Sequence, residues 1–193
     1  MYGFGFTQSE VDIMKEGFNL FLRSSLNNGG GFNSITFHRN PNLGKTITVK
    51  LVNFHSSINT CGNAEFATYQ KIGNDNGVKP GNLININLNY LRGLNNKMKL
   101  NKQQLIFLIA HEFGHTLGLR HTNWKLYNEP EITGNVGAYS VLGTVPFLGA
   151  PPLDPDPNSI FNSTTCGIPF TEFSAYDKIA IKYITNDAPT IIY

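Results

Sequence analysis

This 193-residue sequence contains little cysteine, little charge and no long hydrophobic segment. Two cysteines are too few for a zinc site closed by four thiolates, or for a small scaffold held together by several disulfides. Charged residues make up 15% of the chain and the formal net charge is +2, which is too weak a bias to indicate a nucleic-acid partner. No apolar run reaches the roughly eighteen residues that a membrane span requires. The length then predicts one globular domain, residues 1–193.

One segment near the middle of the chain is rich in metal-binding side chains. Residues 111–121 read His-Glu-Phe-Gly-His-Thr-Leu-Gly-Leu-Arg-His. His111 and His115 are four residues apart, so on a helix both imidazoles face the same side and can reach one metal ion. A helix continued beyond Gly118 would carry His121 away, whereas glycine can end the helix in the left-handed conformation and turn the chain back. The spacing therefore predicts three ligands, His111, His115 and His121, on one metal ion.

Glu112 follows the first of these histidines, which is the position of the general base in the H-E-x-x-H motif. Three protein ligands leave a fourth position of tetrahedral zinc for water, the arrangement of catalytic sites. The chance of meeting the five fixed positions at random is on the order of one in a hundred thousand. We therefore predict a catalytic Zn²⁺ site in which Glu112 takes a proton from the attacking water.

The residues before the motif predict the helix that it needs. Asn101 can cap a helix, and Gln104 follows three positions later as in a capping box. Apolar residues then recur at helical spacing from Leu105 to Leu117. The predicted helix spans residues 101–118 and carries the ligands at its far end.

The pattern H-E-x-x-H-x-x-G-x-x-H resembles the signature of the metzincin zinc endopeptidases, and the phrase as a whole looks most like matrixins and their bacterial relatives. Residues 79–87, Lys-Pro-Gly-Asn-Leu-Ile-Asn-Ile-Asn, and residues 156–162, Asp-Pro-Asn-Ser-Ile-Phe-Asn, are similar to segments of the bacterial dual-action HEIGH metallopeptidases. The resemblance spans residues 45 to 185. It implies a zinc-dependent endopeptidase acting on protein or peptide substrates, with the three histidines as ligands and Glu112 as the base.

The resemblance also implies an α+β, metzincin-like fold. Such a fold has a twisted, mostly parallel sheet with an antiparallel edge strand, an active-site helix, and an irregular lower subdomain with a C-terminal helix. Residues 1–118 would form the upper subdomain and residues 119–193 the lower one. Substrate would bind as an extra strand along an edge of the sheet, and residues 83–89, in which apolar residues are mostly separated by asparagines, are the candidate edge.

One position departs from the pattern of this family. Metzincins place a methionine in a tight turn beneath the zinc, whereas Phe161 occupies the matching position and all three methionines of this chain precede the zinc helix. The ring of Phe161 could provide the apolar floor under the histidines, and the alternative is a floor from residues 136–147. The departure also motivates a second hypothesis, a catalytically impaired zinc-containing binding module, against which the intact Glu112 argues.

Periodicity elsewhere predicts the remaining elements. A capping box at Thr7 and Glu10 begins a first helix that runs to residue 26, and a final helix begins near Ser174 with Asp177 three positions later. Residues 122–171 show no sustained period, so we expect an irregular segment that forms the lower wall of the cleft and a specificity pocket. Strands are predicted at residues 34–38, 46–52, 64–69 and 83–89, and the buried stripe of the last helix at Ile179, Ala180, Tyr183 and Ile184.

The two cysteines leave two alternatives open. A disulfide between Cys61 and Cys166 would tie the two sides of the domain together and stabilise it by about 2 to 4 kcal/mol in an oxidising compartment, whereas two buried free thiols would be inert. Low charge content and abundant Asn, Gly, Ser and Thr favour a secreted or extracytoplasmic protein whose signal peptide and any pro-segment are absent from this chain. We expect a monomer with no nucleic-acid partner and no membrane span.

Overall fold

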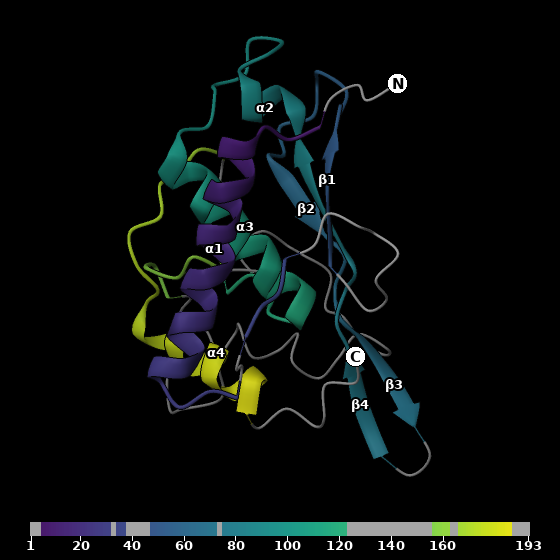
Figure 1. Cartoon of the computed structure of the whole chain (residues 1–193), viewed down its shortest axis with the longest axis vertical. Helices are drawn as coiled ribbons and strands as arrows, with labels where there is room; N and C mark the ends of the chain where they lie inside the picture. Colours follow the sequence, from purple (N-terminus) through teal and green to yellow (C-terminus); the bar gives the residue numbers. More distant parts are fainter. Residues whose placement is uncertain are drawn as a thin grey trace.

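The computed structural model describes residues 5–31, 34–37, 47–72, 75–122, 156–162 and 166–186. Within these residues the fold is mixed α+β, as predicted, with helices packed on one side of a small open sheet (Figure 1). None of the described helices is long and apolar enough to cross a membrane. The helices are α1 (Gln8–Asn27), α2 (Leu88–Arg92), α3 (Lys102–Leu117) and α4 (Ala175–Asn186), and the strands are β1 (Thr48–Val52), β2 (Gly62–Ala64), β3 (Thr68–Ile72), β4 (Asp75–Lys79) and β5 (Leu83–Asn87).

The predicted capping residues start the long helices. Thr7 and Glu10 form a reciprocal capping box at the start of α1, and Asn101 and Gln104 form another at the start of α3. Helix α3 ends at Gly118, which adopts a left-handed conformation with φ 108°, as the motif required. The first helix and the zinc helix were therefore predicted correctly, with bounds within one residue of those observed.

The core lies between α1, α3 and α4. Gly17 lets α1 approach α3 closely, because a β-carbon at that position would lie 2.9 Å from the Cγ2 atom of Ile109. The ring of Phe113 on α3 packs edge-on against Phe18 and Phe21 of α1, with ring centroids 4.9 and 5.0 Å apart. These contacts hold α3, which carries His111 and His115, against α1.

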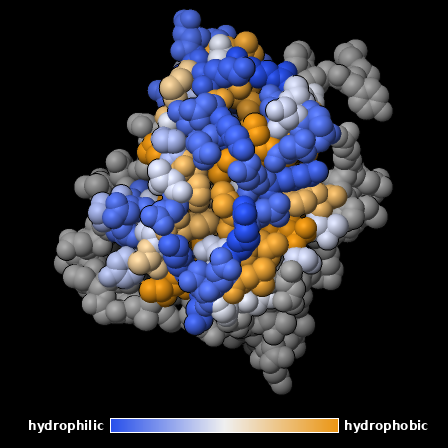
Figure 2. Space-filling view, turned by 60° about the vertical axis from the view of Figure 1, so that its left-hand side comes forward, coloured by the Kyte–Doolittle hydropathy of each residue, from blue (hydrophilic) through white to orange (hydrophobic). Residues whose placement is uncertain are grey.

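The prediction of which residues of α4 are buried was wrong in part. Ile179 is exposed, and Ile181 and Ile184 are the isoleucines of this helix that are fully buried. The helix is therefore rotated about its axis relative to the prediction. Figure 2 shows the molecule from the side of the helices, where hydrophilic and hydrophobic areas of surface are interleaved.

The main sheet has the strand order β1-β5-β2. Strand β5 pairs in parallel with β1 and antiparallel with β2, so the sheet has a parallel pair and an antiparallel edge strand. Ile84 and Ile86 of β5 are fully buried, whereas Leu83 and Asn85 are partly exposed. Strands β3 and β4 form a separate two-stranded hairpin that extends past the end of α3 (Figure 1).

Three strand predictions need correction. Residues 83–89 are not an edge strand, because β5 is paired on both sides and ends at Asn87, which caps α2 by accepting a hydrogen bond from the Asn89 amide. Residues 64–69 are not one strand, because β2 and β3 are separated by residues 65–67. Residues 34–37 form no strand, and residue 38 lies outside the described part of the chain. The predicted strand 46–52 is confirmed over residues 48–52 as β1, and residue 46 lies outside the described part of the chain.

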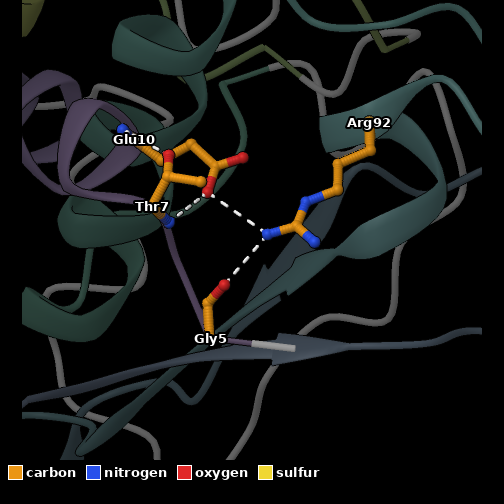
Figure 3. Close-up of polar contacts among 4 residues, drawn as sticks. All are labelled: Gly5, Thr7, Glu10 and Arg92. Carbon is orange, nitrogen blue, oxygen red and sulfur yellow. Dashed lines mark hydrogen bonds and ion pairs between the residues drawn. The ribbon is translucent and has the colours of Figure 1, made fainter. Parts of the chain in front are cut away.

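The N-terminal end of α1 is held by a residue of α2 (Figure 3). One guanidinium nitrogen of Arg92 donates to the carbonyl of Gly5 at 2.9 Å and lies 3.5 Å from a carboxylate oxygen of Glu10. The same oxygen of Glu10 accepts from the backbone amide of Thr7. The capping box of α1 is thus joined to the helix that follows β5.

The cysteine alternatives are also resolved, because Cys61 and Cys166 form a disulfide. Cys61 directly precedes β2, and Cys166 lies in the segment between the 156–162 turn and α4. The same segment is tied to α3, since Gln104 donates to the carbonyl of Gly167 at 2.6 Å and Phe170 donates its amide to the carbonyl of Gln103. The disulfide therefore links the edge strand to the segment that leads into the last helix.

Candidate metal centre

Three imidazoles converge at the end of α3. The Nε2 atom of His115 lies 2.9 Å from that of His111 and 3.1 Å from that of His121, and the Nε2 atoms of His111 and His121 are 3.1 Å apart. A triangle of this size leaves a point about 2 Å from all three nitrogens, which matches the Zn–N bond length. These are the three histidines expected from the sequence, and the left-handed turn at Gly118 brings the third to the first two.

Backbone carbonyls fix the tautomers of the two helical histidines. The Nδ1 atoms of His111 and His115 lie 2.6 Å from the carbonyl oxygens of Ile160 and Leu119. A carbonyl only accepts, so each Nδ1 carries the proton and each Nε2 presents a lone pair. Two lone pairs 2.9 Å apart with no proton between them repel, and a cation placed between them removes that repulsion. The donor set thus fits a divalent metal ion bound by neutral imidazoles.

The electrostatic environment keeps these imidazoles neutral. Burial, reinforced by the neighbouring His121, lowers the pKa of His111 from 6.5 to about 3. Burial and the nearby imidazoles of His111 and His121 also lower the pKa of His115 well below its ordinary value. Metal binding therefore requires no displacement of protons from these two ligands near neutral pH.

Glu112 lies on the same turn of α3, one residue after His111 and three before His115. Its side chain is buried, and burial raises the pKa of the carboxyl group from 4.5 to about 8. A carboxyl group with a pKa of about 8, on the helix that carries two of the three imidazoles, is suited to accept and return a proton.

Phe161 lies beneath the histidines. Phe161 is 1% exposed. Its ring stacks on that of His111, with ring centroids 5.9 Å apart and an interplanar angle of 26°. The centroid of the His115 ring lies 6.4 Å from that of Phe161. Gly114 makes room for it, because a β-carbon on Gly114 would overlap the aromatic ring. Phe161 thus occupies the floor position expected for it. The alternative floor, residues 136–147, lies outside the described part of the chain.

The turn of residues 156–162 is anchored by a carboxylate from α4. Asp177 is 2% exposed and accepts hydrogen bonds from the hydroxyl of Ser159 at 2.5 Å and the amide of Ile160 at 3.0 Å. The carbonyl of Ile160 in turn accepts from His111. Burial raises the pKa of Asp177, while these hydrogen bonds oppose that shift. Asp177 therefore positions the carbonyl that orients a predicted ligand.

A pocket of about 800 Å³ lies against the 156–162 turn, in which the carbonyl of Ile160 contacts His111. Phe107, whose ring centroid lies 5.8 Å from that of His111, forms one side, and residues of the 156–162 turn and of the segment 168–178 form the others. Its lining combines apolar side chains such as Ile168 and Phe173 with the ion pair of Lys178 and Glu172 at 3.5 Å. The ring of His115 contacts that of Phe66, which follows β2, with ring centroids 4.9 Å apart.

The sequence predicted the three histidine ligands and Phe161 beneath them, but not the residues that hold these side chains in place. Asp177 had been assigned only to the capping box that it forms with Ser174, because nothing in the local sequence connects it to residue 160. Phe66 and Phe107 belong to no sequence motif that would indicate their contacts with the histidines. The glycine at 114 could have been noticed, since a helix-interior glycine costs about 1 kcal/mol relative to alanine and therefore indicates close packing.

Comparison with known proteins adds one finding. The sequence profile of the dual-action HEIGH metallopeptidases matches residues 17–185, which is most of the chain. No curated protein and no solved structure matches. The matched range contains the three histidines, Glu112 and the 156–162 turn, so the similarity extends over all the residues that build the metal centre.

Proposed function

The chain belongs to the dual-action HEIGH metallopeptidase family, and from this premise we propose that it is a zinc endopeptidase of the metzincin type that cleaves extended protein or peptide substrates. The observation that carries the proposal is the convergence of three Nε2 lone pairs at the end of α3, the helix in which the residue after His111 is a buried glutamate, Glu112. A purely structural site has no use for that carboxyl group. His111, His115 and His121 would hold the zinc ion, and Glu112 would act as the general base.

When bound, a zinc ion supplies Lewis acidity that makes water nucleophilic near neutral pH and polarises the scissile carbonyl. Glu112 accepts a proton from the attacking water at a carboxylate oxygen and returns it to the amine nitrogen that leaves. Ile160 and Leu119 hold the imidazole rings in place through their carbonyls, and Phe161 excludes water from beneath them. Each of these roles uses a residue fixed by backbone or core contacts.

The substrate would lie between the edge strand and the pocket. Strand β2 has a neighbour on one side only among the described strands, so an extended peptide can add to its other side. The pocket beside Phe107 would receive a side chain next to the cleaved bond, as expected for the lower wall of the cleft. Main-chain pairing would then supply most of the affinity, with one pocket supplying selectivity.

We propose further that the enzyme is secreted or extracytoplasmic. The Cys61–Cys166 disulfide supports a secreted or extracytoplasmic location, because such bonds persist in oxidising compartments. We also propose that the protein acts as a monomer. The competing function, an impaired zinc-containing binding module, was suggested by Phe161 at the position of the family's methionine. Phe161 lies under the histidines without displacing them, which argues against this alternative.

The decisive experiment replaces the base and keeps the ligands. Glu112→Gln should lower cleavage of casein or gelatin by about 10³-fold while the zinc content stays near one ion per chain. Chelation of the wild-type enzyme should abolish cleavage, and zinc should restore it. Retained cleavage by Glu112→Gln would contradict the assignment of the base, and absence of cleavage by the zinc-loaded wild type would favour the binding module.

A further inference from the structure

The hairpin β3–β4 continues the pairing of β2 with β5. In the β2–β5 ladder Ala64 lies opposite Ile84, and the same alignment continued along both chains would place Thr68 opposite Pro80. The β3–β4 ladder instead places Thr68 opposite Lys79. The registers of the two ladders therefore differ by one residue. Both ladders belong to one long antiparallel ribbon, in which residues 62–72 pair with residues 75–87. We call this pair of segments the long ribbon.

The difference in register between the β2–β5 and β3–β4 ladders results from a β-bulge at Pro80-Gly81-Asn82. Glu65 is still paired with Leu83, since its amide donates to that carbonyl at 2.9 Å. Between Glu65 and Thr68 lie two residues, and between Lys79 and Leu83 lie three, so the extra residue is on the second chain. Proline and glycine are tolerated at bulges. The Lys-Pro-Gly-Asn stretch that resembled the family thus encodes the bend of the ribbon.

The bulge is fastened to the zinc helix. The amide of Gly81 donates to the carbonyl of Thr116 at 2.8 Å, next to the ligand His115. The carboxylate of Glu65 accepts from the amide of Asn82 at 3.1 Å across the ribbon. A β-carbon on Gly81 would overlap the carbonyl of Glu65, so the two chains come closest at this point. The ribbon is consequently held at the metal centre and extends beyond it.

The outer edge of the long ribbon runs past the metal centre. On this edge β2 leads through Phe66, which contacts His115, into β3. Among the described strands, β2 pairs only with β5 and β3 only with β4, so both leave the same outer side of the first chain open. Residues 62–72 span roughly 35 Å at about 3.3 Å per residue, enough to pair with a peptide of about ten residues. The strands project beyond the end of α3 (Figure 1).

We propose that β2 and β3 form one continuous docking edge, and that the β3–β4 hairpin is an arm that binds the main chain of the substrate several residues away from the cleaved bond. This inference rests on the proposed function. It specifies the substrate class as polypeptide that is extended over about ten residues, such as an unfolded or flexible segment of a protein. Short peptides reach only β2 and are poorer ligands, and folded proteins without a long flexible segment are not substrates.

The first test shortens the arm. Replacement of residues 70–77 by Asn-Gly leaves Tyr69 opposite Val78 and closes the ribbon with a favoured two-residue turn. Binding is measured by fluorescence anisotropy in the zinc-loaded Glu112→Gln background with two labelled casein fragments, of about twelve and about six residues. The shortened protein should bind the longer fragment about tenfold more weakly and the shorter one unchanged. Equal effects on both fragments would overturn the proposal.

The second test leaves the protein intact and alters the ligand. Single N-methyl groups are placed at successive positions of the longer casein fragment, because a strand donates to its neighbour only through every second amide. Binding to the Glu112→Gln protein should weaken with a period of two along the part of the fragment that lies on the arm. A uniform response, or none, would overturn the docking edge. Periodic binding by a protein whose wild type cleaves nothing would retain the docking edge and reject the proposed hydrolysis.

Discussion

The metal centre and the long ribbon lie against the same helix but are held together in different ways. The three imidazoles of the metal centre come from one short stretch, residues 111–121. The Nδ1 atom of His115 is held by the carbonyl of Leu119 in the same stretch, and that of His111 by the carbonyl of Ile160, 49 residues away. The ribbon is built from main-chain pairing between segments about twenty residues apart, such as Gly62 with Ile86. The spacing of the three ligands is therefore set locally, whereas the ribbon, which we propose as the path of the substrate, is set by the register of distant strands.

A glycine makes the closest approach in each region. Gly114 admits the ring of Phe161 beneath the histidines, and Gly81 admits the carbonyl of Glu65 across the ribbon. A side-chain neighbour can rearrange alone or be replaced by mutation, whereas a backbone neighbour can move only together with its strand. The two regions should therefore respond differently to the same added methyl group and to the loss of the metal.

Removal of the metal should give the largest effect and should separate the two regions. Chelation leaves three imidazole nitrogens within 3.1 Å of one another, so we expect a loss of about 5 kcal/mol in the free energy of unfolding. Hydrogen exchange should show lost protection in the last turn of α3 and in residues 156–162, with little change in β3 and β4. A uniform loss of protection would mean that the ribbon depends on the metal as well.

Gly114→Ala should destabilise the metal centre by about 3 kcal/mol, because the added methyl group overlaps a fully buried ring. Alanine is otherwise favoured in a helix, so the sign of the effect isolates the clash. Combining the change with Phe161→Met should recover part of the loss, since a thioether can adapt to the space left. The measurements are urea unfolding and the visible spectrum of the cobalt-substituted protein, which reports the ligand geometry. Equal stability of the single and double variants would show that Phe161 is not the obstacle.

Gly81→Ala should cost about 2 kcal/mol, and its consequences should fall on the ribbon. The carbonyl of Glu65 must move, so we expect weaker binding of extended peptides with an unchanged cobalt spectrum. Gly5→Ala is a matched control, because a β-carbon there meets nothing within 4 Å. A changed spectrum in Gly81→Ala would show that the hydrogen bond from Gly81 to Thr116 supports the metal centre directly.

The sequence predicted the metal centre well because its determinants are local. Helix α3 begins at its capping residues and ends at Gly118, and the spacing of the three histidines follows from helix geometry and a single left-handed turn. The placement of Phe161 was expected from the resemblance, and its contact with His111 agrees with that expectation.

The ribbon and the end of β5 could not be predicted because they depend on distant partners. Asn87 and Asn89 looked like a polar strand face, yet both are buried and donate to the carbonyls of Thr60 and Phe54. Those partners are about thirty residues away in the sequence, so alternation alone could not identify them. The offset between the two ladders likewise depends on register, which periodicity does not specify.

The smallest effect, taken over any one pH unit, should be a pH dependence confined to the metal centre, measured on the metal-free protein. Folding raises the pKa of Glu112 from 4.5 to about 8, so the unfolded chain releases this proton first as the pH rises. Wild-type stability should therefore fall, relative to Glu112→Gln, by at most about 1.4 kcal/mol per pH unit between these two values, and the difference should be constant below pH 4.5 and above pH 8. His111 contributes the opposite slope between pH 3 and 6.5, and that slope cancels because both proteins contain it. Urea unfolding of the two chelated proteins at pH 5, 6, 7 and 8 measures the difference. A constant difference would show that Glu112 is already ionised in the folded protein, and that its neighbours, rather than its burial, determine its charge.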